Sequence, residues 1–241
     1  MSNARVPYEF KVAQIIDHTP EIRELYLQLV NKPEFTFRAG QFVMLHVPVK
    51  DAPKPALRAY SIASTDEQKD GFKLIFKFVE TGIASRFVWD LKGEEILNMT
   101  GPFGKVFFQE PPTEQILFLN TGSGVSQHFS FLESKMKTHS QIKYKLYFGV
   151  RKEADIYYES EMKRLQKHLP NFKYHYVLSR ASDAWAGKRG YVQHCLKDTD
   201  YKNTPTTFYL CGNGAMIKDV KHQLIAVDGI DKSRIWAEAF D

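Results

Sequence analysis

The sequence predicts two domains, an antiparallel β-barrel followed by a doubly wound α/β domain with a parallel sheet. Three observations carry this prediction. Apolar residues recur every second position in the first half, strand and helix patterns alternate in the second half, and Pro111–Pro112 separates the two patterns. We therefore expect domains at residues 1–110 and 111–241, and a chain of 241 residues is long enough to form a core in each.

The first half reads as short strands punctuated by glycine and proline. In the stretch beginning at Gly71, Phe72, Leu74 and Phe76 fall on one face, whereas Lys73 and Lys77 fall on the other. Such strands are typical of a barrel or sandwich. The clearest predicted strands are 24–30, 41–49 and 71–80, with one short helix at Ala84–Leu91.

The second half alternates strands with helices, which indicates a parallel sheet covered on both faces. The predicted strands are 115–122, 144–150, 172–178, 207–212 and 234–240. The predicted helices run to residue 137 after the first strand and then cover 156–169, 190–198 and 215–227.

Composition excludes several classes of protein. The net charge of +5 comes from residues 111–241 and suits an anionic ligand or an acidic partner, but no basic cluster is interleaved with aromatics, so we expect no nucleic acid. Two cysteines are too few for an iron–sulfur domain, and the eight histidines form no metal-binding spacing, so we expect no metal.

The apolar runs of the chain are short. None reaches about 18 residues, so we expect no membrane span. The N-terminal stretch lacks the apolar core of a signal peptide, which favours a cytoplasmic location. We expect a monomer.

Two glycine turns follow predicted strands of the second half. Thr121-Gly122-Ser123-Gly124 opens a helix, where backbone N–H groups can approach a phosphate, although a plain strand–helix turn has the same pattern. The third glycine of GxGxxG is absent and Arg151 stands where an NAD dehydrogenase has an acid. Cys211-Gly212-Asn213-Gly214 is either a similar plain turn, with the thiol as apolar filler, or a cysteine held against a cofactor.

Several motifs, in order, resemble the ferredoxin–NADP+ reductase family over essentially the whole chain. Arg58-Ala59-Tyr60-Ser61 matches the RxYS flavin motif, and Gly40–Phe42 lies upstream of it. The further matches are the turn around Gly82 and Ser85, the GPFG of 101–104, the turns at 121–126 and 211–216, and the ending Glu238-Ala239-Phe240.

The resemblance implies an FAD-binding barrel and a pyridine-nucleotide domain, with roles for particular residues. Arg58 would pair with the FAD pyrophosphate, Tyr60 would stack on the isoalloxazine and Ser61 would bond flavin N5. Cys211 and Glu238 would line the nicotinamide pocket, and Phe240 would cover the other flavin face. The resemblance implies further cofactor-binding positions at Ala59, Lys77, Gly82, Ala84, Ser85, Thr121, Gly122, Ser123, Gly124, Gly212, Asn213 and Met216.

Basic residues after the third α/β strand favour NADP(H) over NAD(H). The 2′-phosphate and adenine site of NADPH-using relatives is resembled, in residue type and order, by Ser179, Arg180, Arg189 and Tyr191. A solvent-exposed basic turn that binds no ligand would show the same pattern. One departure from the family is Ser126-Gln127, where relatives usually carry Ala-Pro.

The resemblance implies an oxidoreductase that moves a hydride from NADPH or NADH to FAD. Electrons would then pass to a separate ferredoxin or flavodoxin, because the chain carries no iron–sulfur domain of its own. Two alternatives stay open: a flavin or ferric reductase with a small diffusible acceptor, and an FAD-bearing electron-transfer subunit that no longer oxidises NAD(P)H.

Overall fold

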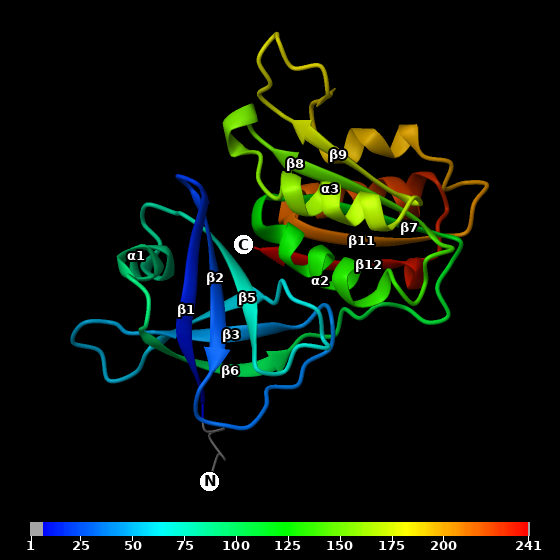
Figure 1. Cartoon of the computed structure of the whole chain (residues 1–241). Coiled ribbons are helices and arrows are strands. Elements are labelled where there is room, and N and C mark those ends of the chain that lie inside the picture. Colours follow the sequence, from blue (N-terminus) through cyan, green and yellow to red (C-terminus); the bar gives the residue numbers. More distant parts are fainter. Residues whose placement is uncertain (1–6, 241) are drawn as a thin grey trace. The chain divides into compact units, whose positions relative to one another are not determined.

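The computed structural model describes residues 7–240, which divide by internal packing into two compact units. The first unit comprises residues up to Phe107 together with Phe129–Ser134, and the second comprises Phe108–His128 and the rest of the chain from Lys135. The two types of sheet confirm the predicted fold class of an antiparallel domain followed by an α/β domain (Figure 1).

The first unit is built on a six-stranded antiparallel sheet in the order β4-β3-β6-β1-β2-β5 (Figure 1). A bridge between Ile62 and Leu74 joins the end of β4 to β5, so the first and last strands of the sheet also meet. The elements are β1 (Tyr8–Thr19), β2 (Ile22–Leu29), β3 (Phe42–Val47), β4 (Ala56–Ser61), β5 (Gly71–Lys77), α1 (Ile83–Asp90) and β6 (Ile96–Phe103).

Period-two patterning explains the core of this unit. The predicted inward set of β5, Phe72, Leu74 and Phe76, is fully buried, whereas Lys73 and Lys77 are half-buried. The aromatic rings of Phe10, Phe35 and Phe72 pack edge-on or tilted, with centroids 4.7 to 5.4 Å apart, and fill the interior. Burial of these rings supplies the apolar area that stabilises a small sheet domain.

The second unit has a six-stranded parallel sheet in the order β10-β9-β8-β7-β11-β12 (Figure 1). Strand order reverses between β7 and β11, the place where open α/β sheets bind ligands at their carboxyl ends. The strands are β7 (Gln115–Thr121), β8 (Lys143–Val150), β9 (Phe172–Leu178), β10 (Lys188–Arg189), β11 (Thr206–Asn213) and β12 (Ile235–Phe240).

The helices of the second half of the chain follow the strands in the predicted alternation. They are η1 (Gly122–Gly124), α2 (Val125–Lys135), η2 (Glu153–Asp155), α3 (Glu159–His168), η3 (Val192–Asp198), α4 (Gly214–His222), η4 (Gln223–Val227) and η5 (Lys232–Arg234). Two details differ from the sequence prediction. The helix expected at 190–198 is a 3₁₀-helix, and the one expected at 215–227 ends as an α-helix at His222 and continues as a π-helical turn.

No helix among residues 7–240 is long and apolar enough to cross a membrane. Within the same residues no three His, Cys, Asp or Glu side chains are grouped as a metal site requires.

Candidate functional site

The RxYS motif forms the end of β4, at one side of the first sheet. Arg58 and Tyr60 are two residues apart and therefore share a face, and the exposed Arg58 guanidinium donates to the carbonyl oxygen of Leu57, at 2.9 Å. The Tyr60 ring packs on Phe76 with 4.3 Å between centroids, and burial raises the pKa of Tyr60 to about 12. A neutral aromatic and an exposed guanidinium on one face suit a flavin and its pyrophosphate.

The turn before α1 carries the other predicted FAD-binding residues. Ser85 is buried and its hydroxyl donates to the carbonyl oxygen of Val79 at 2.6 Å while accepting from the Val79 N–H at 3.1 Å. The serine thus fixes the turn. Gly82 gives α1 no side-chain cap, and the first turn of α1 holds no acidic residue. The backbone N–H groups of this first turn can therefore face an anion. The residues present fit an FAD pyrophosphate.

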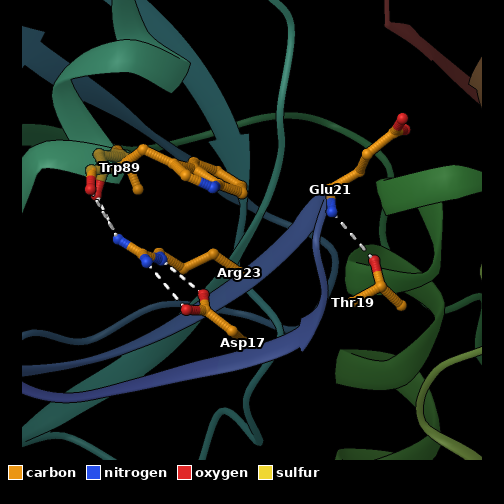
Figure 2. A network of polar contacts seen from close by, with 6 residues as sticks. Asp17, Thr19, Glu21, Arg23 and Trp89 are labelled. Atoms are coloured by element: carbon orange, nitrogen blue, oxygen red, sulfur yellow. Dashed lines mark hydrogen bonds and ion pairs between the residues drawn. The ribbon is translucent and has the colours of Figure 1, made fainter.

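Arg23 ties the opposite end of α1 to the β1–β2 hairpin (Figure 2). Its guanidinium donates to both carboxylate oxygens of Asp17, at 2.6 and 2.9 Å, and to the carbonyl oxygens of Val88 and Trp89, at 3.0 and 3.2 Å. The same guanidinium lies 5.0 Å from the centre of the Trp89 ring. A cation at a helix C-terminus is favoured by the helix dipole, so Arg23 holds α1 in place.

Replacing Arg23 by methionine should reduce the free energy of unfolding by about 2 kcal/mol, because hydrogen bonds to a mostly buried charged group are lost. Retention of FAD should fall with it, since the α1 turn loses its anchor. Denaturant titration and flavin content after gel filtration measure the two effects. Lys69→Met is the matched control: the Lys69–Glu34 pair is 3.6 Å long and exposed, so its loss should change little. Equal effects of the two variants would contradict the anchoring role.

In the second unit, the two glycine turns lie side by side where β7 and β11 end. Thr121 Oγ1 accepts the backbone N–H of Asn213 at 2.9 Å, and a Cβ on Gly124 would run into the Cys211 carbonyl oxygen. Gly122, with φ +51°, has open space where its Cβ would be. The turn at 121–124 is therefore packed on one side and open on the other, as a nucleotide cradle requires.

The turn after β11 is capped by its own side chain. Asn213 Oδ1 accepts the N–H of Met216 at 3.1 Å and so caps α4. Cys211, just before it, is fully buried between Asn120 of β7 and Glu238 of β12 in the strand register. Burial, and then the charge of Glu238, raise the pKa of the Cys211 thiol, so the sulfur is a neutral group.

Two buried polar residues near these turns were not among the predicted site residues. Gln127 of α2 donates its side-chain amide to Glu238 Oε2 at 2.9 Å, and His128 Nδ1 lies 3.4 Å from Asn120 Oδ1. Both side chains are fully buried. The sequence singled out Gln127 only as a departure from the family pattern, and nothing in it distinguished His128 from a surface histidine.

Burial lowers the pKa of His128 to about 3, so the folded protein holds a neutral imidazole. Below the ordinary pKa of about 6.5, the unfolded chain binds a proton that the folded chain excludes, and stability therefore falls as the pH drops from 6.5 towards 3. The expected slope from this one residue is about 1.4 kcal/mol per pH unit.

His128→Phe should flatten this dependence, because it removes the titrating group. The introduced ring can pack on Phe118, whose ring centroid lies 4.9 Å from that of His128. Denaturant titrations of both proteins give the slope of the free energy of unfolding against pH. The titrations run between pH 7 and pH 5, because the ordinary histidine pKa is about 6.5. The difference between the two slopes isolates His128 from other histidines. Identical slopes would show that His128 titrates normally.

The predicted 2′ end of the nucleotide site lies at the carboxyl edge of β9 and β10. Gly190 N–H donates to the Leu178 carbonyl oxygen at 2.9 Å, which brings the segment before Tyr191 beside Ser179 and Arg180. Arg180 is exposed, and no side-chain hydrogen bond or ion pair engages its guanidinium within residues 7–240. Tyr191 is 59% exposed, so its ring can be covered by a ligand.

Arg189 differs from Arg180 although both come from this basic region. Its guanidinium donates to the carbonyl oxygens of Asp183 and Trp185, at 3.0 and 2.8 Å, and so braces the loop between β9 and β10. Of the other predicted positions, Ser61 ends β4, Lys77 ends β5, and Phe240 ends β12 opposite Asn213.

Family profiles match both parts of the chain. The Oxidoreductase FAD-binding domain matches residues 9–108 and the Oxidoreductase NAD-binding domain matches residues 118–222. Ferredoxin–NADP reductase B of Sorangium cellulosum is 30% identical over 244 residues, which span 98% of each chain. The chain belongs to the ferredoxin–NADP+ reductase family. It is a flavoprotein oxidoreductase with FAD- and NAD(P)-binding domains, as the sequence motifs predicted.

Further similar proteins include a subunit of another enzyme and a second ferredoxin reductase. One component of the Na⁺-translocating NADH-quinone reductase of Klebsiella pneumoniae is 27% identical, over 83% of this chain and 60% of that component. This chain therefore spans less than two thirds of the component's length. Among solved structures, the ferredoxin NADP⁺ reductase of Neisseria gonorrhoeae with bound FAD and NADP has a TM-score of 0.80 at 23% identity, covering 96% of this chain and 97% of that one. This likeness confirms the fold.

Proposed function

We propose that this family member is an FAD-containing NADPH oxidoreductase that passes electrons to a separate redox protein such as a ferredoxin or flavodoxin. The observation that carries the choice of NADPH is the unengaged guanidinium of Arg180, just beyond the carboxyl end of β9, in a segment that lies beside the one leading to the exposed Tyr191. A planar cation recognises a 2′-phosphate, and an exposed aromatic ring recognises adenine.

The separate acceptor is supported by the relative of matching length. The Sorangium protein, covered over 98% of its length, is named a ferredoxin–NADP reductase, and the excess positive charge of residues 111–241 suits an acidic carrier. The alternative of an electron-transfer subunit is supported by the similarity to the NADH-quinone reductase component of Klebsiella pneumoniae.

In this proposal each unit binds one cofactor. Bound FAD supplies the chemistry that accepts a hydride and releases electrons. Arg58 and the first turn of α1 bind its pyrophosphate, Tyr60 packs on its ring system, and Ser61 donates to it. The turns at 121–124 and 212–214 bind the nucleotide phosphates and the nicotinamide, and Glu238 and Cys211 orient the nicotinamide ring. The protein's contribution is chiefly alignment of the two cofactors.

Anaerobic mixing with NADPH and with NADH tests the proposal. NADPH should bleach the visible absorption of the bound flavin, and a reduced ferredoxin or flavodoxin should form when that carrier is added. If neither nucleotide bleaches the flavin, the protein is not an NAD(P)H oxidoreductase. If the flavin is bleached but only free flavin or a ferric chelate accepts electrons, the small-acceptor alternative replaces the protein carrier.

A further inference from the structure

The side chain of Gln127 reaches from α2 to β12. Its Nε2 donates to Oε2 of Glu238 at 2.9 Å, and the two residues belong to the same compact unit. Gln127 is fully buried, whereas Glu238 is half-buried. Burying a long polar side chain costs conformational entropy and hydration, so a glutamine in this position needs a compensating bond, and a bond to a carboxylate is among the stronger ones.

The carboxylate that Gln127 contacts stands at a defined place in the sheet. In the strand register, Asn120 of β7, Cys211 of β11 and Glu238 of β12 lie abreast at the carboxyl ends of the strands. β12 is the edge strand, so sheet pairing restrains Glu238 on one side only. The amide of Gln127 supplies a second restraint from the helix that follows the β7 turn.

We propose that Gln127 is a positioning residue that fixes the carboxylate of Glu238 beside Cys211 in the nicotinamide pocket. The inference rests on the proposed function of that pocket and names a residue that serves it. A proline at this position, as in the family pattern, would have no side-chain donor, so the contact depends on the glutamine. Because a misplacement of about 1 Å at a reacting centre can cost about 100-fold in rate, such a restraint matters for hydride transfer.

Nuclear magnetic resonance tests the contact in the FAD-loaded protein without turnover. The side-chain amide signals of Gln127 are those missing from the spectrum of Gln127→Met, a variant that keeps the volume and removes the donor. These signals should move when Glu238 is replaced by alanine. The amide of Gln115, which donates to Thr206 Oγ1 at 3.1 Å at the other end of the strands, should not move. Gln127 signals that stay in place in Glu238→Ala would overturn the proposal.

Stopped-flow reduction of the flavin by NADPH tests the consequence. Gln127→Met should slow reduction at saturating NADPH by about tenfold and change the Kd for NADPH by less than about twofold. Gln115→Met is the matched control, a buried glutamine of the same unit that loses one hydrogen bond, and its rate should stay at the wild-type value. In a Glu238→Ala background, Gln127→Met should cost less than about a further twofold, because its target is gone.

The outcomes separate the two proposals. A wild-type flavin that neither nucleotide reduces would contradict the proposed function, and the resonance experiment would then decide the Gln127 contact by itself. A full tenfold loss that persists in the Glu238→Ala background, or an equal loss in Gln115→Met, would show a general packing role and overturn the positioning role.

Discussion

Gly212→Ala is expected to destabilise the α/β domain by about 4 kcal/mol, through backbone strain and overlap together. Gly212 has φ +125°, which side-chain-bearing residues rarely adopt, and its Cβ would overlap Thr121 Oγ1 and lie 2.8 Å from the Thr121 carbonyl oxygen. The backbone of Thr121 cannot move away easily, because Thr121 Oγ1 also accepts the N–H of Asn213. The substitution thus pushes apart the two turns that form the proposed nucleotide cradle.

Thermal and denaturant unfolding measure this loss, and flavin reduction by NADPH should disappear with it. Gly229→Ala is the matched control: Gly229 also has a positive φ, +69°, but nothing lies within 4 Å of its added Cβ. Backbone strain alone should cost the control about 1 kcal/mol. If both variants lost the same stability, the close approach of the two turns would not be a determinant of the fold.

The elements that the sequence predicted well are those whose burial follows a simple period. Phe72, Leu74 and Phe76 alternate along the chain and are buried in the structure, and the strands of the α/β domain are nearly continuous apolar runs. In contrast β10 consists only of Lys188 and Arg189, too short and too polar to show any period. It exists because the chain runs parallel to the end of β9, a tertiary contact.

Motifs named the candidate site residues, but the partner of each side chain depended on loop conformation. The motif comparison treats Arg180 and Arg189 alike, yet the Arg189 guanidinium is engaged by carbonyl oxygens of the loop at 181–185. Ser85 likewise uses its hydroxyl to close the turn before α1. The partners of these side chains can be assigned only from the path of the backbone. Every residue has the same backbone carbonyl group, so the sequence does not show which of them a side chain contacts.

Because the contacts of Arg180 and Arg189 differ, replacing each of them tests whether Arg180 binds the 2′-phosphate of NADPH. Arg180→Ala should lower kcat/KM for NADPH by about 30-fold and leave that for NADH within about twofold, because a hydrogen-bonded charge pair with the 2′-phosphate is worth roughly 2 kcal/mol. NADH lacks this phosphate. The loss should appear mainly in KM, since the phosphate is remote from the reacting atoms and binds equally before and during hydride transfer.

Arg189→Ala serves as the matched control within the same basic region. Its guanidinium braces the loop through the carbonyl oxygens of Asp183 and Trp185, so its loss should loosen the adenine end for both nucleotides alike. Steady-state kinetics with NADPH and NADH on the two variants therefore give two patterns, selective for Arg180 and unselective for Arg189. If Arg180→Ala weakened both nucleotides equally, Arg180 would not bind the 2′-phosphate, and the assignment of NADPH as the preferred donor would lose its structural basis.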